Sequence, residues 1–134
     1  MSINELRSGI ATNLASISGL RVSAEVPDNP NPPVAVVQLQ TIAYDGAMAN
    51  GLTTYNFLVS VIVGRTAERE AQRRLDNYAN SSGSSSVKAA IQSDKTLGGA
   101  AYDVRVSEMT NIGAVLLGEA TYLAADFVVT VYAD

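Results

Sequence analysis

The hydrophobic positions at the start of the chain repeat with the period of a helix. Over residues 3–17 an apolar side chain recurs every three or four positions, at Ile3, Leu6, Ile10, Leu14 and Ile17. These side chains share one helix face, and Gly19 stands where a left-handed residue would end the helix. Over residues 20–26 the period changes to two, which predicts a half-buried strand.

Two longer alternating segments, residues 34–40 and 53–64, predict two further strands. The connection before them, residues 27–33, contains all 4 prolines, so we expect a stiff, extended surface segment there. The connection between them, residues 41–53, is too long for a tight hairpin turn, and connections of this length are usually disordered or functional. We interpret it as a projecting arm that orders on a partner, with a mobile loop as the alternative.

Two short helices are predicted on either side of the run SSGSSS at residues 81–86. Their apolar stripes are thin: Ala67, Ala71, Leu75 and Tyr78 in the first, and Val87, Ala90 and Ile91 in the second. Neither helix would be stable without packing on the same sheet, so the run is a corner within one domain rather than a linker. Gly83 can end the first helix, and Ser84 or Ser85 can cap the second.

The last third of the chain predicts two or three strands. In the final one an apolar face is formed by Leu123, Ala125, Phe127, Val129 and Val131. The opposite face is mixed: Tyr122, Ala124, Asp126, Val128, Thr130 and Tyr132. A face of that kind is too apolar for free solvent and too polar for a core, and it commonly contacts another subunit.

The order of these elements predicts the fold class α+β, as a single domain over residues 1–134. We expect one mostly antiparallel sheet of about five strands. The N-terminal helix and the central helix pair would pack together on one face of that sheet.

Composition narrows the possible functions. Only 16% of the 134 residues are charged, against roughly a quarter in an ordinary domain, which suits a surface that packs on other protein. The net charge is −4 and no basic cluster exceeds Arg73–Arg74, which argues against sequence-specific DNA binding but allows DNA to pass without adhering. We find no signal peptide and no apolar stretch of membrane-spanning length.

The residues that enzymes use are scarce. The chain has 0 cysteines and 0 histidines, which excludes thiolate and imidazole metal sites and catalysis by Cys–His or Ser–His pairs. It has no phosphate-binding loop and no nucleophile elbow. The acidic residues that could act instead are dispersed: Asp94, Asp103, Glu108, Glu119 and Asp126. We therefore expect no enzyme, no catalytic residue and no cofactor or metal.

Asp126 stands apart from the other acids because it lies in the middle of a strand, between Ala125 and Phe127. Two interpretations are open. Its carboxylate pairs with a residue such as Arg105 on a neighbouring strand, or it contacts another subunit.

Residues 63–106 resemble tail-completion or tail-terminator proteins of long-tailed bacteriophages, especially those that infect actinobacteria. The shared elements are V-G-R at 63–65, A-x-x-x-L-D-x-Y at 71–78, S-G-S-x-S-V-K-x-A-I at 82–91, D-x-T-L-G-G at 94–99 and V-R-V at 104–106. The N-terminal helix, the proline-rich connector and the closing Y-L-A-A-D-F-V-V are also similar, so the resemblance spans nearly the whole chain. The order and spacing of these elements carry it, because each motif alone is structural.

The resemblance implies a structural virion protein of a long non-contractile tail. Such a subunit closes into a ring, usually a hexamer, at the head-proximal end of the tail tube. The ring ends tube polymerisation and joins the tail to the neck. Its partners would be copies of itself, the major tail tube protein and the neck stopper or connector protein, with DNA passing non-specifically through the lumen and no membrane. The protein would be assembled in the host cytoplasm and located in the virion.

We expect the arm to reach the next subunit or the tube, and the mixed sheet face to form part of the ring contact. The residues expected at a subunit or tube interface are Tyr44, Asp45, Met48, Asn50, Leu52, Asp126 and Tyr132. Two alternatives remain. One is a head-completion or stopper protein of the head–tail connector, and the other is a small bacterial binding module whose sheet holds a ligand.

Overall fold

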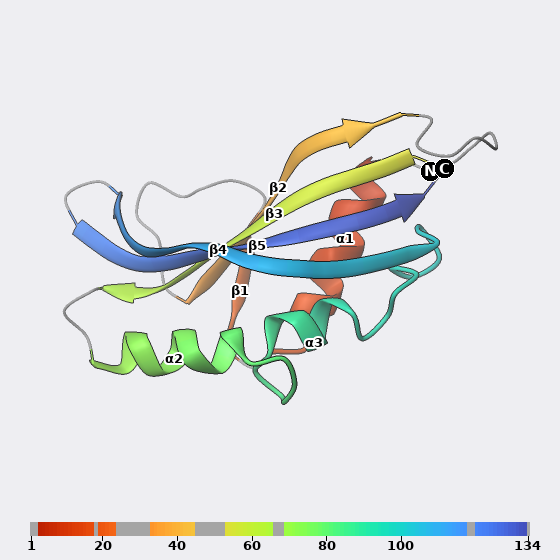
Figure 1. Ribbon diagram of the computed structural model, residues 1–134. Coiled ribbons are helices and arrows are strands. Elements are labelled where there is room, and N and C mark those ends of the chain that lie inside the picture. Colours follow the sequence, from red (N-terminus) through yellow and green to blue (C-terminus); the bar gives the residue numbers. More distant parts are fainter. Residues whose placement is uncertain are drawn as a thin grey trace.

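The computed structural model describes residues 3–17, 19–23, 33–44, 53–65, 69–117 and 120–133. These residues form one sheet with helices along one of its faces (Figure 1). The elements are α1 (Ile3–Leu14), β1 (Arg21–Ser23), β2 (Val34–Ala43), β3 (Thr53–Arg65), α2 (Arg69–Ala79), α3 (Val87–Ile91), β4 (Asp103–Leu117) and β5 (Ala120–Ala133). The predicted α+β class and the five-stranded, mostly antiparallel sheet are confirmed.

The strand order in the sheet is β1-β2-β3-β5-β4. Only β1 runs parallel to its neighbour, and it pairs with the first part of β2 alone, from Val34 to Val36. The two central strands, β3 and β5, lie side by side along most of their length, whereas β4 forms the far edge. The residues of β3 and β5 therefore dominate both faces of the sheet.

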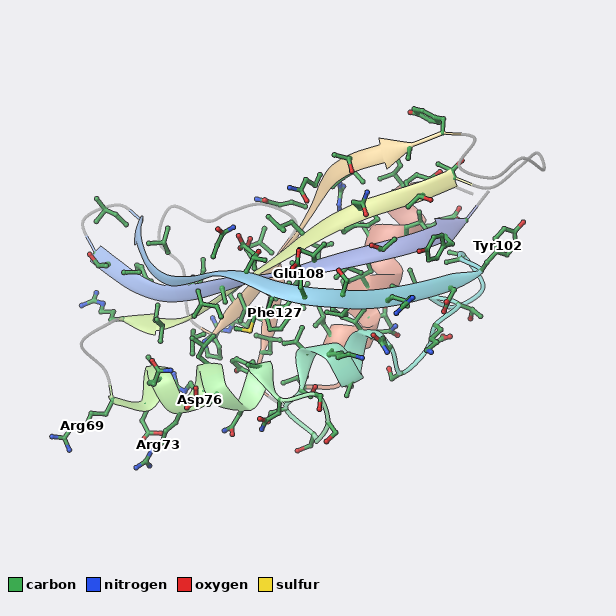
Figure 2. The ribbon with its side chains drawn as sticks, in the orientation of Figure 1. Arg69, Arg73, Asp76, Tyr102, Glu108 and Phe127 are labelled. Atoms are coloured by element: carbon green, nitrogen blue, oxygen red, sulfur yellow. The ribbon has the colours of Figure 1, made fainter. Side chains whose placement is uncertain are left out.

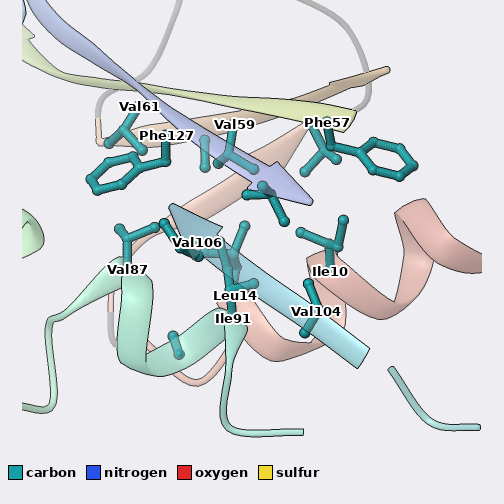
Figure 3. Packing of buried hydrophobic residues seen from close by; sticks show 14 of the residues in the cluster. Ile10, Leu14, Phe57, Val59, Val61, Val87, Ile91, Val104, Val106 and Phe127 are labelled. Atoms are coloured by element: carbon teal, nitrogen blue, oxygen red, sulfur yellow. The ribbon is translucent and has the colours of Figure 1, made fainter. Parts of the chain in front are cut away.

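One face of the sheet forms the core with the helices. On β3 the alternation puts Tyr55, Phe57, Val59, Val61 and Val63 inside, all of them buried. Figure 3 shows helix side chains such as Ile10 and Ile91 in the same cluster as these strand residues. Burying such side chains contributes about 1.5–3 kcal/mol each, so the sheet and the helix layer stabilise each other. In Figure 2 Phe127 points toward the helix layer, while Glu108 lies on the other side of the sheet.

The helices α2 and α3 pack against this one core. Leu75 of α2 and Ile91 of α3 are buried in the same cluster, so the serine-rich run joins two helices of one core. The N-cap of α3 is Ser86, one or two residues after the predicted Ser85 or Ser84. The Ser86 hydroxyl oxygen accepts a hydrogen bond from the backbone N–H of Ala89 at 3.1 Å. Gly83 adopts φ 109°, a left-handed conformation that suits glycine and allows the chain to turn.

The loop after α3 holds α1 in place. Leu97 is buried, and a Cβ atom at Gly9 would lie 2.6 Å from the Leu97 Cβ. Beside this contact, the Asn13 Nδ2 donates to the backbone oxygens of Ile91 at 2.8 Å and Asp94 at 3.0 Å. Asn13 is buried, and its amide joins α1 to the carbonyl of Ile91 and to that of Asp94, which also accepts the Leu97 N–H at 3.1 Å, so it fixes the register of α1 on the loop.

Asp94 in turn shapes that loop. Its Oδ1 accepts hydrogen bonds from the Thr96 hydroxyl at 2.7 Å and the Thr96 N–H at 3.1 Å, and its Oδ2 accepts from the Gly98 N–H at 3.0 Å. These bonds favour the ionised carboxylate and lower the pKa of Asp94, the Thr96 hydroxyl being the largest cause. The closed turn allows Leu97 to adopt φ 51° and reach the core.

Some predicted boundaries were wrong. The strand β2 continues to Ala43 rather than ending at residue 40, because Thr41, Ile42 and Ala43 go on pairing with β3 after a bulge that follows Leu39. The connection to β3 is shorter by that amount. Of the two or three strands predicted for the last third, the described residues form two, because β4 runs unbroken to Leu117 beside its partner β5. Ile17 is buried although α1 ends before it, at Leu14.

Candidate functional site

The face of the sheet opposite the helices, called the second face below, is formed mainly by alternate residues of β3 and β5. On β3 these are Thr54, Asn56, Leu58, Ser60 and Ile62, and on β5 they are Tyr122, Ala124, Asp126, Val128, Thr130 and Tyr132. All are half-buried except Ile62 and Tyr122, which join Val34 in a small buried cluster at one end. The mixed face that the sequence predicted is therefore present as one continuous surface.

Polar side chains in the middle of the second face bond to one another across the strands. The Asn56 Nδ2 donates to the Thr41 hydroxyl at 2.8 Å, and the Asn56 Oδ1 accepts from the Thr130 hydroxyl at 3.2 Å. This ladder links β2, β3 and β5. Because these groups already have partners, the face can pack against another protein without leaving them unsatisfied.

A groove of about 390 Å³ lies on the second face. Its apolar walls come from Leu58, Ile62, Val115 and Ala124, and its charged residue is Asp126. Ligand and partner sites commonly combine apolar walls with a few fixed polar groups. The groove is thus the most concentrated candidate site on this face.

The carboxylate of Asp126 is held by two neutral donors. The Ser60 hydroxyl donates to its Oδ1 at 2.7 Å, and the Asn111 Nδ2 donates to its Oδ2 at 2.9 Å. These two partners do come from neighbouring strands, but Arg105, the example that the sequence suggested, is not one of them, because it lies opposite Thr130, further along β5. The two donors fix the orientation of the carboxylate but bring no positive charge.

Sequence reasoning missed Ser60 and Asn111. Asn111 adopts φ 53°, the left-handed region that asparagine tolerates better than most residues, within a bulge of β4 between Thr110 and Gly113. A signal for it was available. A regular hairpin that begins with the pair Leu117–Ala120 would place residue 111 opposite Asp126.

The charges on the second face are few and mostly negative. Asp103, Glu108 and Asp126 are acidic and Arg65 and Arg105 are basic, and each pairs with, or lies among, residues of this face. Within the described ranges the one ion pair is elsewhere, between Glu70 and Arg73 on α2 at 3.7 Å. Asp126 therefore has no ion-pair partner in the described part of the chain.

The other predicted interface residues fall in different places. Tyr44, at the end of β2, is 73% exposed. Tyr132 is half-buried on the second face, but six residues separate it from Asp126 on one strand, which is roughly 20 Å. Asp45, Met48, Asn50 and Leu52 lie outside the described residues. Of the described members, Asp126 and Tyr132 share the second face but lie apart on it, and the groove at Asp126 forms with residues of β3 and β4.

The far end of β4 adds an apolar surface that sequence reasoning did not identify. Ile112 is 59% and Leu116 67% exposed, on an edge strand. Nearer the start of β4 the edge is occupied, because the Gln92 Oε1 accepts the Val106 N–H at 3.0 Å and also accepts from the Lys88 Nζ at 3.1 Å. Open strand edges with apolar side chains are prone to associate with other protein, so this end is a second candidate contact.

Two further observations concern metal sites and membrane-spanning helices. Among the described residues, no three acidic side chains lie close enough together to hold a metal ion. In that same part of the chain, no helix has the length and apolar character needed to cross a membrane.

The second face, with the groove at Asp126, thus carries the features expected of a protein–protein contact: apolar walls, mutually bonded polar groups and little charge. Comparison of the sequence with models of known protein families and with curated proteins found no match.

Proposed function

We propose that this protein is a bacteriophage tail terminator, a structural subunit that closes into a ring at the head-proximal end of the tail tube. The ring, a hexamer as the resemblance implies, ends tube polymerisation and joins the tail to the neck. The order and spacing of the motifs over residues 63–106 support this assignment.

The observation that carries the proposal is the second face of the sheet. Half-buried side chains run along both central strands there, and no helix of the described residues covers them. Burying apolar surface contributes about 25 cal/mol per Å², so a surface of this kind gains stability when another protein covers it. Head-to-tail contacts between subunits close into a ring when the rotation between neighbours permits. In such a ring a neighbouring subunit can cover this face on every copy.

The charge of the chain supports passage of DNA through the ring. A net charge of −4, with no basic cluster larger than Arg73–Arg74, gives phosphates little to bind. DNA would then move through the lumen without specific binding.

A small-ligand binding module is the rival function that one observation favours, since the groove has a volume within the range of ligand pockets. Its walls come from strands of a single open sheet, however, which enclose a ligand less than a cleft between domains does. We therefore place the module second.

Light scattering and electron microscopy test the proposal together. We expect the purified protein, added to tail tubes assembled without a terminator, to form a ring on one end of each tube and to stop its elongation. Rings that bind the portal side and leave tube length uncontrolled would support the stopper instead. Protein that stays monomeric with and without tubes, and leaves their length unchanged, would contradict the proposal.

A further inference from the structure

The groove on the second face holds a carboxylate whose charge is not balanced there. Asp126 lies among Leu58, Ile62 and Val115, and its two hydrogen-bond donors, Ser60 and Asn111, are neutral. Each carboxylate oxygen accepts one of these bonds and has capacity for another. Surface charges usually remain in water, but this one is half-buried between apolar walls, where an opposite charge would be attracted strongly.

An arginine side chain matches this groove in shape and charge. Its guanidinium can donate two parallel hydrogen bonds to a carboxylate, and its aliphatic stem can lie on apolar walls. Lysine would supply the charge but not the paired donors. The groove therefore favours an arginine from outside the fold, since the neighbouring Arg105 faces Thr130 instead.

The helix α2 presents arginines on the opposite side of the molecule. Its sequence contains three arginines against two acidic residues, Glu70 and Asp76. Arg69 and Arg73 are exposed and four positions apart, which places them on one side of the helix. Figure 2 shows both side chains extending away from the sheet. Among the described residues, Arg73 pairs with Glu70 at 3.7 Å, in an exposed pair of the kind that contributes little.

We propose that the groove at Asp126 of one copy of this chain binds the Arg69–Arg73 side of α2 of a second copy. The complementary charges carry the inference, together with the apolar walls. The helix layer and the second face lie on opposite sides of the sheet, so one copy cannot satisfy its own groove. The contact is head-to-tail and leaves a free groove and a free helix at the two ends, as a closing ring requires. The inference rests on the proposed function, in that copies associate around an axis.

Charge reversal tests this contact. Asp126→Lys on one variant, and Arg69→Glu with Arg73→Glu on another, should each reduce the assembled fraction by about tenfold or more, because like charges then meet at every contact. Mixing the two variants should restore assembly, because natural contacts then alternate with contacts in which both charges are reversed, and opposite charges meet at each of them. Sedimentation velocity measures the assembled fraction, on tail tubes if the free protein does not associate. Circular dichroism and thermal unfolding identify any variant that fails to fold, and Asp126→Asn serves as a milder version.

Cross-linking gives a second readout that does not depend on assembly strength. The chain has 0 cysteines, so an introduced pair is the sole source of disulfides. Val115→Cys, which lies opposite Tyr122 on the second face and lines the groove, mixed with Gln72→Cys on the outer side of α2, should form disulfide-linked pairs of copies under mild oxidation. Tyr102→Cys, exposed at the start of β4, is the matched control and should not link to Gln72→Cys.

The outcomes separate the two proposals. If the wild type forms rings and the reversed variants form them equally well, the Asp126–arginine contact is wrong and the ring stands. A failure of mixing to restore assembly, with both variants folded, also contradicts the contact. If the wild type forms no ring even on tail tubes, the proposed function fails, and this contact fails with it.

Discussion

The two faces of β3 and β5 come from the same residues in alternation, yet they have different partners. On one face Phe57, Val59 and Val129 are completely enclosed by the helix layer. On the other, Leu58, Val128 and Thr130 are only half-buried, although they occupy the middle of the same strands. The chain completes one face by itself and leaves the other incomplete, which is the difference expected between a folding core and an assembly surface.

The largest loss of stability should come from truncating a side chain on the helix side of the sheet, and truncating its neighbour on the second face gives the comparison. Phe57→Ala removes a buried aromatic ring and should lower the free energy of unfolding by about 3–5 kcal/mol. Leu58→Ala, the matched change on the second face, should cost less than half of that in the isolated chain because its side chain is only half-buried. Urea unfolding of dilute protein measures both. Equal losses would mean that the second face is already a core.

A substitution where α1 contacts the loop at Leu97 should destabilise the protein by the next largest amount. Gly9→Ala places a Cβ 2.6 Å from the Leu97 Cβ and 3.0 Å from the Leu97 backbone oxygen, so α1 or the loop must shift. We expect a loss of about 1–3 kcal/mol in thermal or urea unfolding, the usual range for overpacking. Ser8→Ala, one position earlier on the same helix, is the control. A neutral result for Gly9→Ala would show that the loop moves freely.

The covered face could be predicted from sequence because its signal is local. A period of two with every large apolar residue on one side fixes the inward face of β3, and a period near 3.6 does the same for α1. The role of the serine run followed from the need for short helices to pack on a shared core. These inferences required no knowledge of which strands are neighbours.

The candidate site depends on pairing between strands, and this is why less of it could be predicted. The partners of Asp126 come from β3 and from β4, and the register of β4 changes at two bulges, after Val106 and after Thr110. Counted from the pair Leu117–Ala120, a regular hairpin would put Arg105 opposite Tyr132, and the two bulges bring it opposite Thr130, so Arg105 faces Asp126 in neither register. The side chain of Asn111 reaches Asp126 from within the second bulge, which no periodicity reports.

Substitutions in the bulge of β4 at Asn111 should lower the free energy of unfolding less than substitutions in the core do. Asn111→Ala loses the hydrogen bond to Asp126. It also puts alanine, which tolerates the left-handed region less well than asparagine, at φ 53°. We expect the free energy of unfolding to fall by about 1–2 kcal/mol. Asn111→Gly loses the same bond but tolerates this φ, and it should cost less than Asn111→Ala. Urea unfolding separates the two. If glycine is the more damaging, the hydrogen bond and not the backbone conformation sets the cost.

The smallest change in stability should come from substituting Asp94, an exposed residue in the loop that packs against α1. Three hydrogen bonds from Thr96 and Gly98 lower its pKa in the folded protein below the usual value of 3.8. A carboxylate with a lowered folded pKa stabilises the protein above its unfolded pKa, and this contribution is lost as the pH falls through the folded value. Asp94→Asn should therefore be less stable than the wild type at neutral pH, and the difference should shrink as the pH falls below about 4. Thr96→Val, which removes the hydroxyl donor, should reduce the same pH-dependent difference. If the gap between wild type and Asp94→Asn is the same at pH 7 and pH 3, the turn at Asp94 does not hold α1 through its charge, and the covered face relies on packing at Gly9 and on the Asn13 amide alone.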